Sequence, residues 1–163
     1  MLDTREFERG RQGELAIARW LQERGWYVIP SYDYSGQDGT KAPRLQGLLA
    51  GYAIPDLDVC RGGDRMWVEV KVKGGATYHR LTDTFEHGIS LRLYRHYLEV
   101  QRLTGTQVWL FVLEDDAAEL RAQSIDKLGK PRIYDGRKMG RDGMAFWPRS
   151  KFVAVAQLSR CTP

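Results

Sequence analysis

Two aspartates, a glutamate and a lysine occur within residues 54–73 at spacings that can bring them together. The stretch alternates with a period of two: Ile-Pro-Asp-Leu-Asp-Val-Cys, an Arg-Gly-Gly-Asp-Arg turn, then Met-Trp-Val-Glu-Val-Lys-Val-Lys. Alternation on both sides of a glycine pair predicts a β-hairpin. Because successive side chains point to opposite faces of a strand, we expect the three carboxylates and Lys71 on one face of the sheet. The carboxylates are Asp56, Asp58 and Glu69.

Carboxylates held side by side repel each other, and a bound cation offsets that repulsion most simply. The alternative is an ordinary hairpin with one charged, solvated face. Ile54, Cys60 and Trp67 are expected on the same face, and they are poor surface residues. The sequence therefore favours a half-buried cleft in which a metal ion is bound beside a lysine.

The same residues resemble the motif of a known nuclease superfamily. Pro55-Asp56, followed by Glu69-Val70-Lys71, is similar to the Pro-Asp…(Asp/Glu)-x-Lys motif of the PD-(D/E)XK superfamily, in its Holliday junction resolvase-like and restriction endonuclease-like branch. The resemblance implies an α/β fold with a mixed sheet, whose core runs helix, three strands, helix, strand. It also implies metal-dependent hydrolysis of phosphodiester bonds in DNA, with branched or structured DNA as a candidate substrate.

The resemblance also implies roles for the hairpin residues. Asp56 and Glu69, with the backbone carbonyl of Val70, are expected to hold one or two Mg²⁺ ions, and Mn²⁺ is expected to substitute. Lys71 is expected to orient the attacking water or to neutralise developing charge. Asp58 shares the face of Asp56, so it stays open as a second ligand or as the ligand in place of Asp56.

A further carboxylate is expected from the first helix, which the sequence predicts over residues 3–24 with Gly25 as its stop. The predicted core-facing stripe consists of Phe7, Gly10, Glu14, Ile17, Ala18 and Leu21. A carboxylate in such a stripe is costly unless it is paired with an arginine or linked to a metal. Many resolvase-like members carry a glutamate on this helix that reaches the active centre, so the resemblance assigns Glu14 to the metal site, directly or through a water.

The rest of the core follows in the implied order. Residues 26–30 and 107–113 are predicted strands, the second of them buried on both faces. Ser90 is the expected N-cap of a second helix that ends at Gly105. Gln101 points to the core from this helix, either as a polar residue near the metal or as a side chain that caps backbone groups.

Three segments are predicted to be loops: residues 31–52, residues 76–90 and residues 126–151. The first leads into Asp56 and is expected to lie over the cleft. The third holds eight Lys or Arg against three Asp, which favours either phosphate binding by counterion release or a merely solvated loop. The residues expected to contact DNA are Lys41, Arg44, Lys73, Arg137, Lys138 and Arg141.

Composition sets the outer limits of the interpretation. With 163 residues and 42% hydrophobic content, we expect a single domain, a core over about 3–113 and a β-rich C-terminal extension over about 114–163. A net charge of +4 mildly favours a polyanion such as DNA. The chain lacks a run of about 18 apolar residues and an N-terminal apolar segment, so no membrane association is expected.

Two cysteines far apart in the sequence fit a reducing cytoplasm. The resemblance also implies a homodimer, since such relatives often pair to cut two strands. The alternative function is a non-catalytic nucleic-acid-binding or structural protein built on the same fold. That alternative would normally have lost Asp56, Glu69 or Lys71, and all three residues are present.

Overall fold

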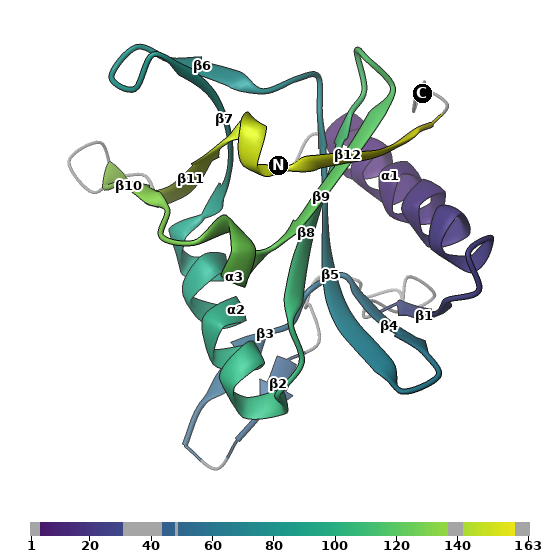
Figure 1. Cartoon of the computed structure of the whole chain (residues 1–163). Coiled ribbons are helices and arrows are strands. Elements are labelled where there is room, and N and C mark those ends of the chain that lie inside the picture. The colour runs from purple at the N-terminus through teal and green to yellow at the C-terminus, as the bar shows by residue number, and fades with distance from the viewer. Residues whose placement is uncertain (1–3, 31–43, 48, 137–141, 159–163) are drawn as a thin grey trace.

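A six-stranded mixed sheet forms the centre of the molecule (Figure 1). The computed structural model describes residues 4–30, 44–47, 49–136 and 142–158. The strands of the sheet, in spatial order, are β1 (Tyr27–Pro30), β4 (Leu57–Arg61), β5 (Asp64–Lys73), β8 (Val108–Glu114), β9 (Glu119–Ser124) and β12 (Val153–Gln157). Strands β5 and β8 pair in parallel, while the other neighbours pair antiparallel.

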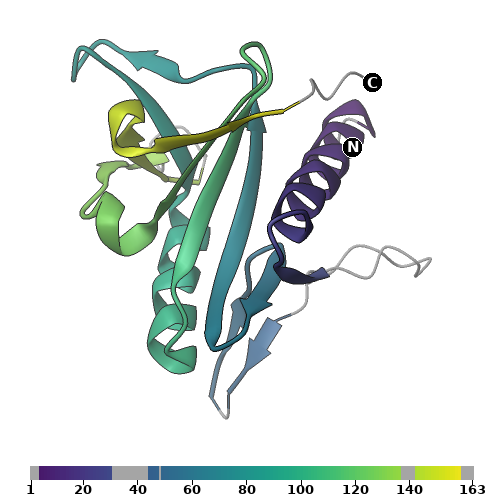
Figure 2. The same cartoon turned by 45° about the vertical axis from the view of Figure 1, so that its right-hand side comes forward.

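The two long helices, α1 (Thr4–Gln22) and α2 (Leu91–Thr104), cover opposite faces of this sheet (Figure 2). The core on the α1 face includes Ile17, Leu21, Leu57, Val59, Val68 and Val70. The core on the α2 face includes Trp67, Tyr97, Val100, Val108, Leu110 and Trp147. The sheet is therefore buried on both faces where β5 and β8 cross its centre, as the apolar sequence of β8 predicts.

The local signals in the sequence account for most of these elements. The β4–β5 hairpin turns at Gly62, whose φ of +57° is in the left-handed region that favours glycine. Helix α2 starts directly after Ser90, as predicted, but the Ser90 hydroxyl makes no capping hydrogen bond among the described residues. The helix ends at Gly105, which also has a left-handed conformation. The predicted order of helix, three strands, helix, strand is present as α1, β1, β4, β5, α2 and β8.

One expectation for the first helix was wrong. Phe7, placed in the core-facing stripe, is 49% exposed. The helix instead approaches the sheet through buried Gly13, where an added Cβ would lie 2.1 Å from a methyl carbon of Val72. The missing side chain allows the backbone of α1 to lie directly against β5, which tilts the contacting stripe away from Phe7.

A second sheet replaces two of the predicted loops. Its spatial order is β10 (Arg132–Tyr134), β11 (Met144–Pro148), β7 (Thr84–Ser90) and β6 (Thr77–His79). The described parts of the segments 76–90 and 126–151 thus form strands rather than loops, joined to short helices α3 (Ile125–Leu128) and η2 (Arg149–Lys151). Strand β7 pairs with β11, more than 50 residues later, so neither segment could reveal its partner locally.

The first predicted loop is also partly ordered. Strands β2 (Arg44–Gln46) and β3 (Gly51–Ala53) form a two-stranded sheet, and His96 of α2 accepts a hydrogen bond from Ala53 N at 2.8 Å. The rest of the segment predicted as a loop, residues 31–43 and residue 48, lies outside the described residues. No helix in the described part of the chain is both long and apolar enough to span a membrane.

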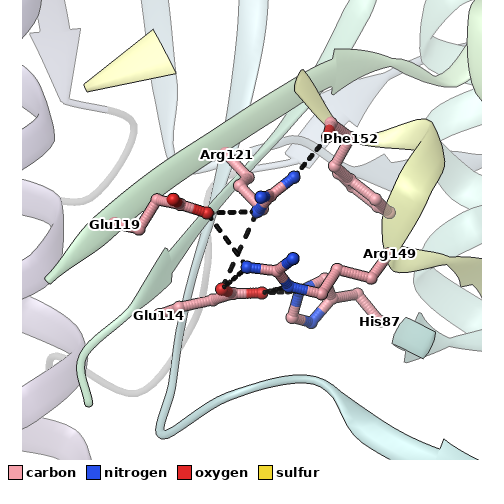
Figure 3. A network of polar contacts seen from close by, with 6 residues as sticks. All are labelled: His87, Glu114, Glu119, Arg121, Arg149 and Phe152. Atoms are coloured by element: carbon pink, nitrogen blue, oxygen red, sulfur yellow. Dashed lines mark hydrogen bonds and ion pairs between the residues drawn. The ribbon is translucent and has the colours of Figure 1, made fainter. Parts of the chain in front are cut away.

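A buried network of charged groups fastens the second sheet to the first (Figure 3). His87 of β7 contacts Glu114 of β8, with 2.7 Å between Nε2 and Oε1. Arg149 donates to both oxygens of Glu114 at 2.7 Å and to Glu119 at 3.0 Å. Arg121 forms an ion pair with Glu119 at 2.5 Å. Burial lowers the pKa of His87, the contact with Glu114 opposes this effect, and Arg149 and Arg121 add to it.

Candidate active site

Asp56 lies at the point where strand β4 stops pairing with β5. The described ladder runs from Arg61 opposite Asp64 to Leu57 opposite Val68. Just beyond it, the Asp56 carboxylate accepts a hydrogen bond from Val70 N at 2.8 Å and so replaces the next backbone acceptor of the ladder. This bond fixes one oxygen of a carboxylate that is only 8% exposed. The other oxygen has no hydrogen-bond partner among the described residues.

Glu69 is almost fully buried and has a donor at each oxygen. Lys71 Nζ donates to Oε1 at 2.5 Å, and the hydroxyl of Tyr97, on α2, donates to Oε2 at 2.5 Å. Glu69 is 2% exposed, and a polar group buried to this degree needs hydrogen-bond partners. Among the described residues, helix α2 therefore contributes Tyr97 to the site, a residue that the sequence analysis did not identify.

Glu14 is brought to the same region by the close packing of α1 on β5. Gly13, its neighbour, touches Val72, and this contact sets the depth and rotation of the helix. A cleft of about 370 Å³ opens between the helix and the strand. Its lining residues are Glu6, Phe7, Arg9, Gly10, Arg11, Glu14, Asp56, Val70, Lys71, Val72 and Lys73. Four of the residues predicted for catalysis or metal binding, Glu14, Asp56, Val70 and Lys71, thus line one cleft, and Glu69 is bonded to Lys71.

The carboxylates of the cleft are partly buried and repel one another, so a bound cation would stabilise them. Burial raises the pKa of Asp56 well above its ordinary value, and the charges of Glu69 and Glu14 raise it further, against the opposing effect of Lys71. Burial and the charge of Lys71 lower the pKa of Lys73, which lies two residues beyond Lys71 on β5. A divalent cation beside Asp56 would relieve the repulsion between the carboxylates.

The donor chemistry fits a hard divalent cation. Asp56 and Glu14 offer carboxylate oxygens to the cleft, and hard cations such as Mg²⁺ prefer oxygen ligands with few protein carboxylates. Among the described residues, no three His, Cys, Asp or Glu side chains already stand together in metal-binding geometry. Both oxygens of Glu69 accept hydrogen bonds, one from Lys71 and one from Tyr97.

The structure does not bring two of the predicted residues to this cluster. Asp58 forms a two-point ion pair with Arg65, at 2.9 and 2.8 Å, on the stretch of β4 that is already paired with β5. Gln101 caps backbone and side-chain groups instead: it accepts from Val108 N at 2.7 Å and donates to Asp126 at 3.0 Å. Of the two interpretations given for Gln101, its observed contacts are those of the capping side chain.

The residues predicted to contact DNA are spread over the chain. Lys73 lines the cleft, whereas Arg44 lies on β2 and donates to the carbonyl of Gly51 at 2.8 Å. The other four, Lys41, Arg137, Lys138 and Arg141, lie outside the described residues. Several cations of the segment 126–151 have internal partners, which reduces its capacity to bind phosphate. These pairs are Arg132 with Glu86, Arg149 with Glu114, and Lys151 with the carbonyl of Leu128.

Comparison with solved structures relates the fold to known nucleases. The chain is similar to the 1.6 Å structure of Hjc, a Holliday junction resolvase from the archaeal hyperthermophile Archaeoglobus fulgidus, with a TM-score of 0.57 and 14% identity over 91% of this chain and 93% of that one. A second similar structure is D212, a nuclease from a fusselovirus, with a TM-score of 0.49 and 14% identity over 94% of this chain and 89% of that one. No protein-family model matches the sequence, and no curated protein matches it significantly. At this level of identity the likeness concerns the fold, and it confirms the predicted mixed α/β class.

Proposed function

We propose that this chain, which has the restriction endonuclease-like fold of the PD-(D/E)XK nucleases, is a metal-dependent nuclease that hydrolyses phosphodiester bonds in DNA. One observation carries the proposal: Asp56, which precedes β4, bonds the backbone of Val70 on β5, between Glu69 and Lys71, and both Asp56 and Lys71 line a cleft of about 370 Å³. Burying charged groups in this way costs folding free energy, and a protein that used the fold only as a scaffold would gain no activity in return.

In the proposed site, Asp56 and Glu14 supply carboxylate oxygens to the cation, and Val70 of β5, whose carbonyl is the further expected ligand, lines the same cleft. A bound Mg²⁺ ion would polarise the scissile phosphate and lower the pKa of the attacking water. Lys71 has its ammonium on the cleft side of Glu69 and is placed to orient that water or to offset charge on the phosphate. Tyr97 holds Glu69 from the opposite side and so fixes the carboxylate to which Lys71 is bonded.

A non-catalytic DNA-binding protein on the same fold is the second candidate. It is favoured by the contacts of Glu69, since a carboxylate whose two oxygens are already satisfied has less capacity to take part in metal binding. The first candidate is the better supported, because Asp56 keeps an oxygen without a partner among the described residues and faces the cleft.

The two candidates differ in a cleavage assay. Purified protein is incubated with plasmid, single-stranded and four-way-junction DNA in Mg²⁺, Mn²⁺ or EDTA, beside Lys71→Ala. The control is Arg19→Ala, which removes an exposed cation of α1 outside the cleft. Metal-dependent cutting that falls about 100- to 1000-fold in Lys71→Ala alone supports the nuclease. Binding without cutting in either metal, equal in all three proteins, would identify the non-catalytic candidate. The preferred DNA would decide whether branched substrates are favoured.

A further inference from the structure

The hairpin formed by β6 and β7 carries two exposed aromatic rings. Tyr78 and Phe85 are directly opposite each other in the strand pairing, with ring centroids 5.4 Å apart. Tyr78 is 48% exposed and Phe85 57% exposed, and Leu81 at the turn is 92% exposed. Figures 1 and 2 show the hairpin projecting from the body of the molecule. Apolar groups gathered at such a site indicate a contact surface.

The two rings lie on the face of the second sheet that is turned toward the first. Alternation along β7 places Phe85 on the same side as His87 and Ile89, and both of these are buried, His87 against Glu114 of the six-stranded sheet. Phe85 lies on the same side of β7 as these two buried residues, but the six-stranded sheet does not cover it. The aromatic pair therefore forms the uncovered end of an otherwise buried surface.

The same hairpin is rooted beside the candidate active site. A small crevice is lined jointly by Lys71 and Lys73 of β5 and by residues 87–89 of β7. Along the chain, only four residues separate Lys73 from Tyr78. A substrate that lies over the cleft and extends along the end of β5 thus reaches the aromatic pair next.

The rings are held in place before any partner binds. The Tyr78 hydroxyl donates to Asp83 at 2.5 Å, and Asp83 has a φ of +50°, a conformation that costs energy for a residue with a side chain. Below the turn, buried Glu86 accepts from Thr82 at 3.1 Å and from Arg132. A fixed aromatic surface loses little conformational entropy when it binds.

The charge at the turn indicates which part of a nucleic acid the rings would meet. Asp83 is bonded to Tyr78, so a phosphate at the ring edge would meet a carboxylate, whereas the flat face of a base carries no such penalty. Arg80 is exposed at the turn and can contact the phosphate backbone of the nucleic acid farther from the rings. Base faces are accessible to aromatic side chains where strands are unpaired and not inside a duplex.

We propose that Tyr78 and Phe85 form a stacking platform for unpaired bases of the DNA substrate, so that the nuclease favours DNA with single-stranded or splayed segments near the cut. This inference rests on the proposed function and goes beyond it by assigning the preference to a defined surface outside the catalytic cleft.

Binding to labelled single-stranded, forked and fully paired DNA in EDTA tests the proposal by fluorescence anisotropy with the full chain. Replacing both rings by alanine is expected to weaken binding of the single-stranded and forked DNA about 10- to 100-fold, with little change for the duplex. The pair Tyr78→Leu and Phe85→Leu keeps apolar bulk on the strands but lacks a π-face, so the same loss is expected. Tyr27→Ala, which removes a 74% exposed tyrosine from β1, is the control and should bind like the wild type.

Wild-type affinity of both double variants for all three DNAs would overturn the stacking platform. Full retention of DNA binding in the leucine pair alone would also overturn it, because apolar bulk without a π-face would then be sufficient. Cutting of DNA by the same variants in Mg²⁺ keeps the two claims separate. An active nuclease with unchanged DNA preference refutes only the platform, whereas a wild-type chain that neither cuts nor binds DNA refutes the proposed function.

Discussion

Replacing Tyr97 by phenylalanine tests whether helix α2 holds the catalytic carboxylate. The Tyr97 side chain is 2% exposed and its hydroxyl donates to Glu69 at 2.5 Å. Phenylalanine keeps the ring in the core, so the change removes one donor from a buried carboxylate that has two. We expect the free energy of unfolding to fall by about 1.5–3 kcal/mol, the usual range for a hydrogen bond to a charged group.

The same substitution should reduce cleavage more than it reduces binding. Without the hydroxyl, Glu69 is fixed only by the flexible side chain of Lys71, so the position of both groups becomes less certain. Loss of such a supporting contact typically lowers activity about 10- to 100-fold. The measurement is single-turnover cleavage in Mg²⁺, together with urea unfolding at the same pH.

Tyr94→Phe is the matched control because it removes a hydroxyl from the same helix. Tyr94 packs edge-on against Trp147, and its hydroxyl has no hydrogen bond among the described residues. Stability and cleavage are expected to change little in this variant. Equal stability and equal cleavage in Tyr97→Phe and the wild type would refute the idea that Tyr97 supports Glu69.

Two further predictions concern the packing of α1 and the buried histidine. Gly13→Ala forces a methyl group toward Val72, so we expect a loss of about 1–3 kcal/mol in unfolding free energy and slower cleavage. Gly10→Ala is the control: nothing lies within 4 Å of its new Cβ, so this change should be neutral or stabilising by up to about 1 kcal/mol. Equal effects at both positions would contradict the close packing of α1 on β5. Burial lowers the pKa of His87, so its contribution to stability is complete above the ordinary histidine pKa of about 6.5 and is lost as the pH falls below it. His87→Gln should lose less unfolding free energy between pH 7 and pH 5 than the wild type does. The remaining dependence of the unfolding free energy on pH is due partly to His96, whose pKa is lowered by burial and by Arg44 and Arg92. An unchanged dependence on pH would show that His87 is not the titrating group.

The hairpin that carries the site was predictable from sequence because its signals are local. The alternation on both sides of Gly62-Gly63 determines which side chains share a face, and the structure has the predicted pairing. The face is not uniform, however: Asp58 stays on the paired part of β4 and bonds Arg65, while Asp56 lies past the end of the ladder. Alternation of residue types along a strand identifies which side chains share a face of the sheet. It gives no information on where the pairing between two strands ends.

The second sheet was not predictable because its pairing partners are far apart in sequence. Residues 84–90 mix charged, aromatic and glycine positions and resemble a polar loop until β11 is placed beside them. Gly88 is needed there because an added Cβ would lie 2.4 Å from the ring of Phe146. Tyr97 was missed for a similar reason, since its hydroxyl finds Glu69 only after α2 has packed on the sheet.

The central claim is tested most directly by single-turnover cleavage of labelled DNA in Mg²⁺ and in EDTA, with Asp56→Asn compared to Asp58→Asn. The first change removes the cleft-facing charge but keeps an acceptor for Val70 N; the second removes a charge that is bonded to Arg65. We predict cutting in Mg²⁺ by the wild type and Asp58→Asn, loss of cutting in Asp56→Asn, and none by any of the three in EDTA. Cutting by Asp56→Asn at the wild-type rate, or equal cutting in EDTA, would contradict the assignment of this cleft as a metal-dependent nuclease centre.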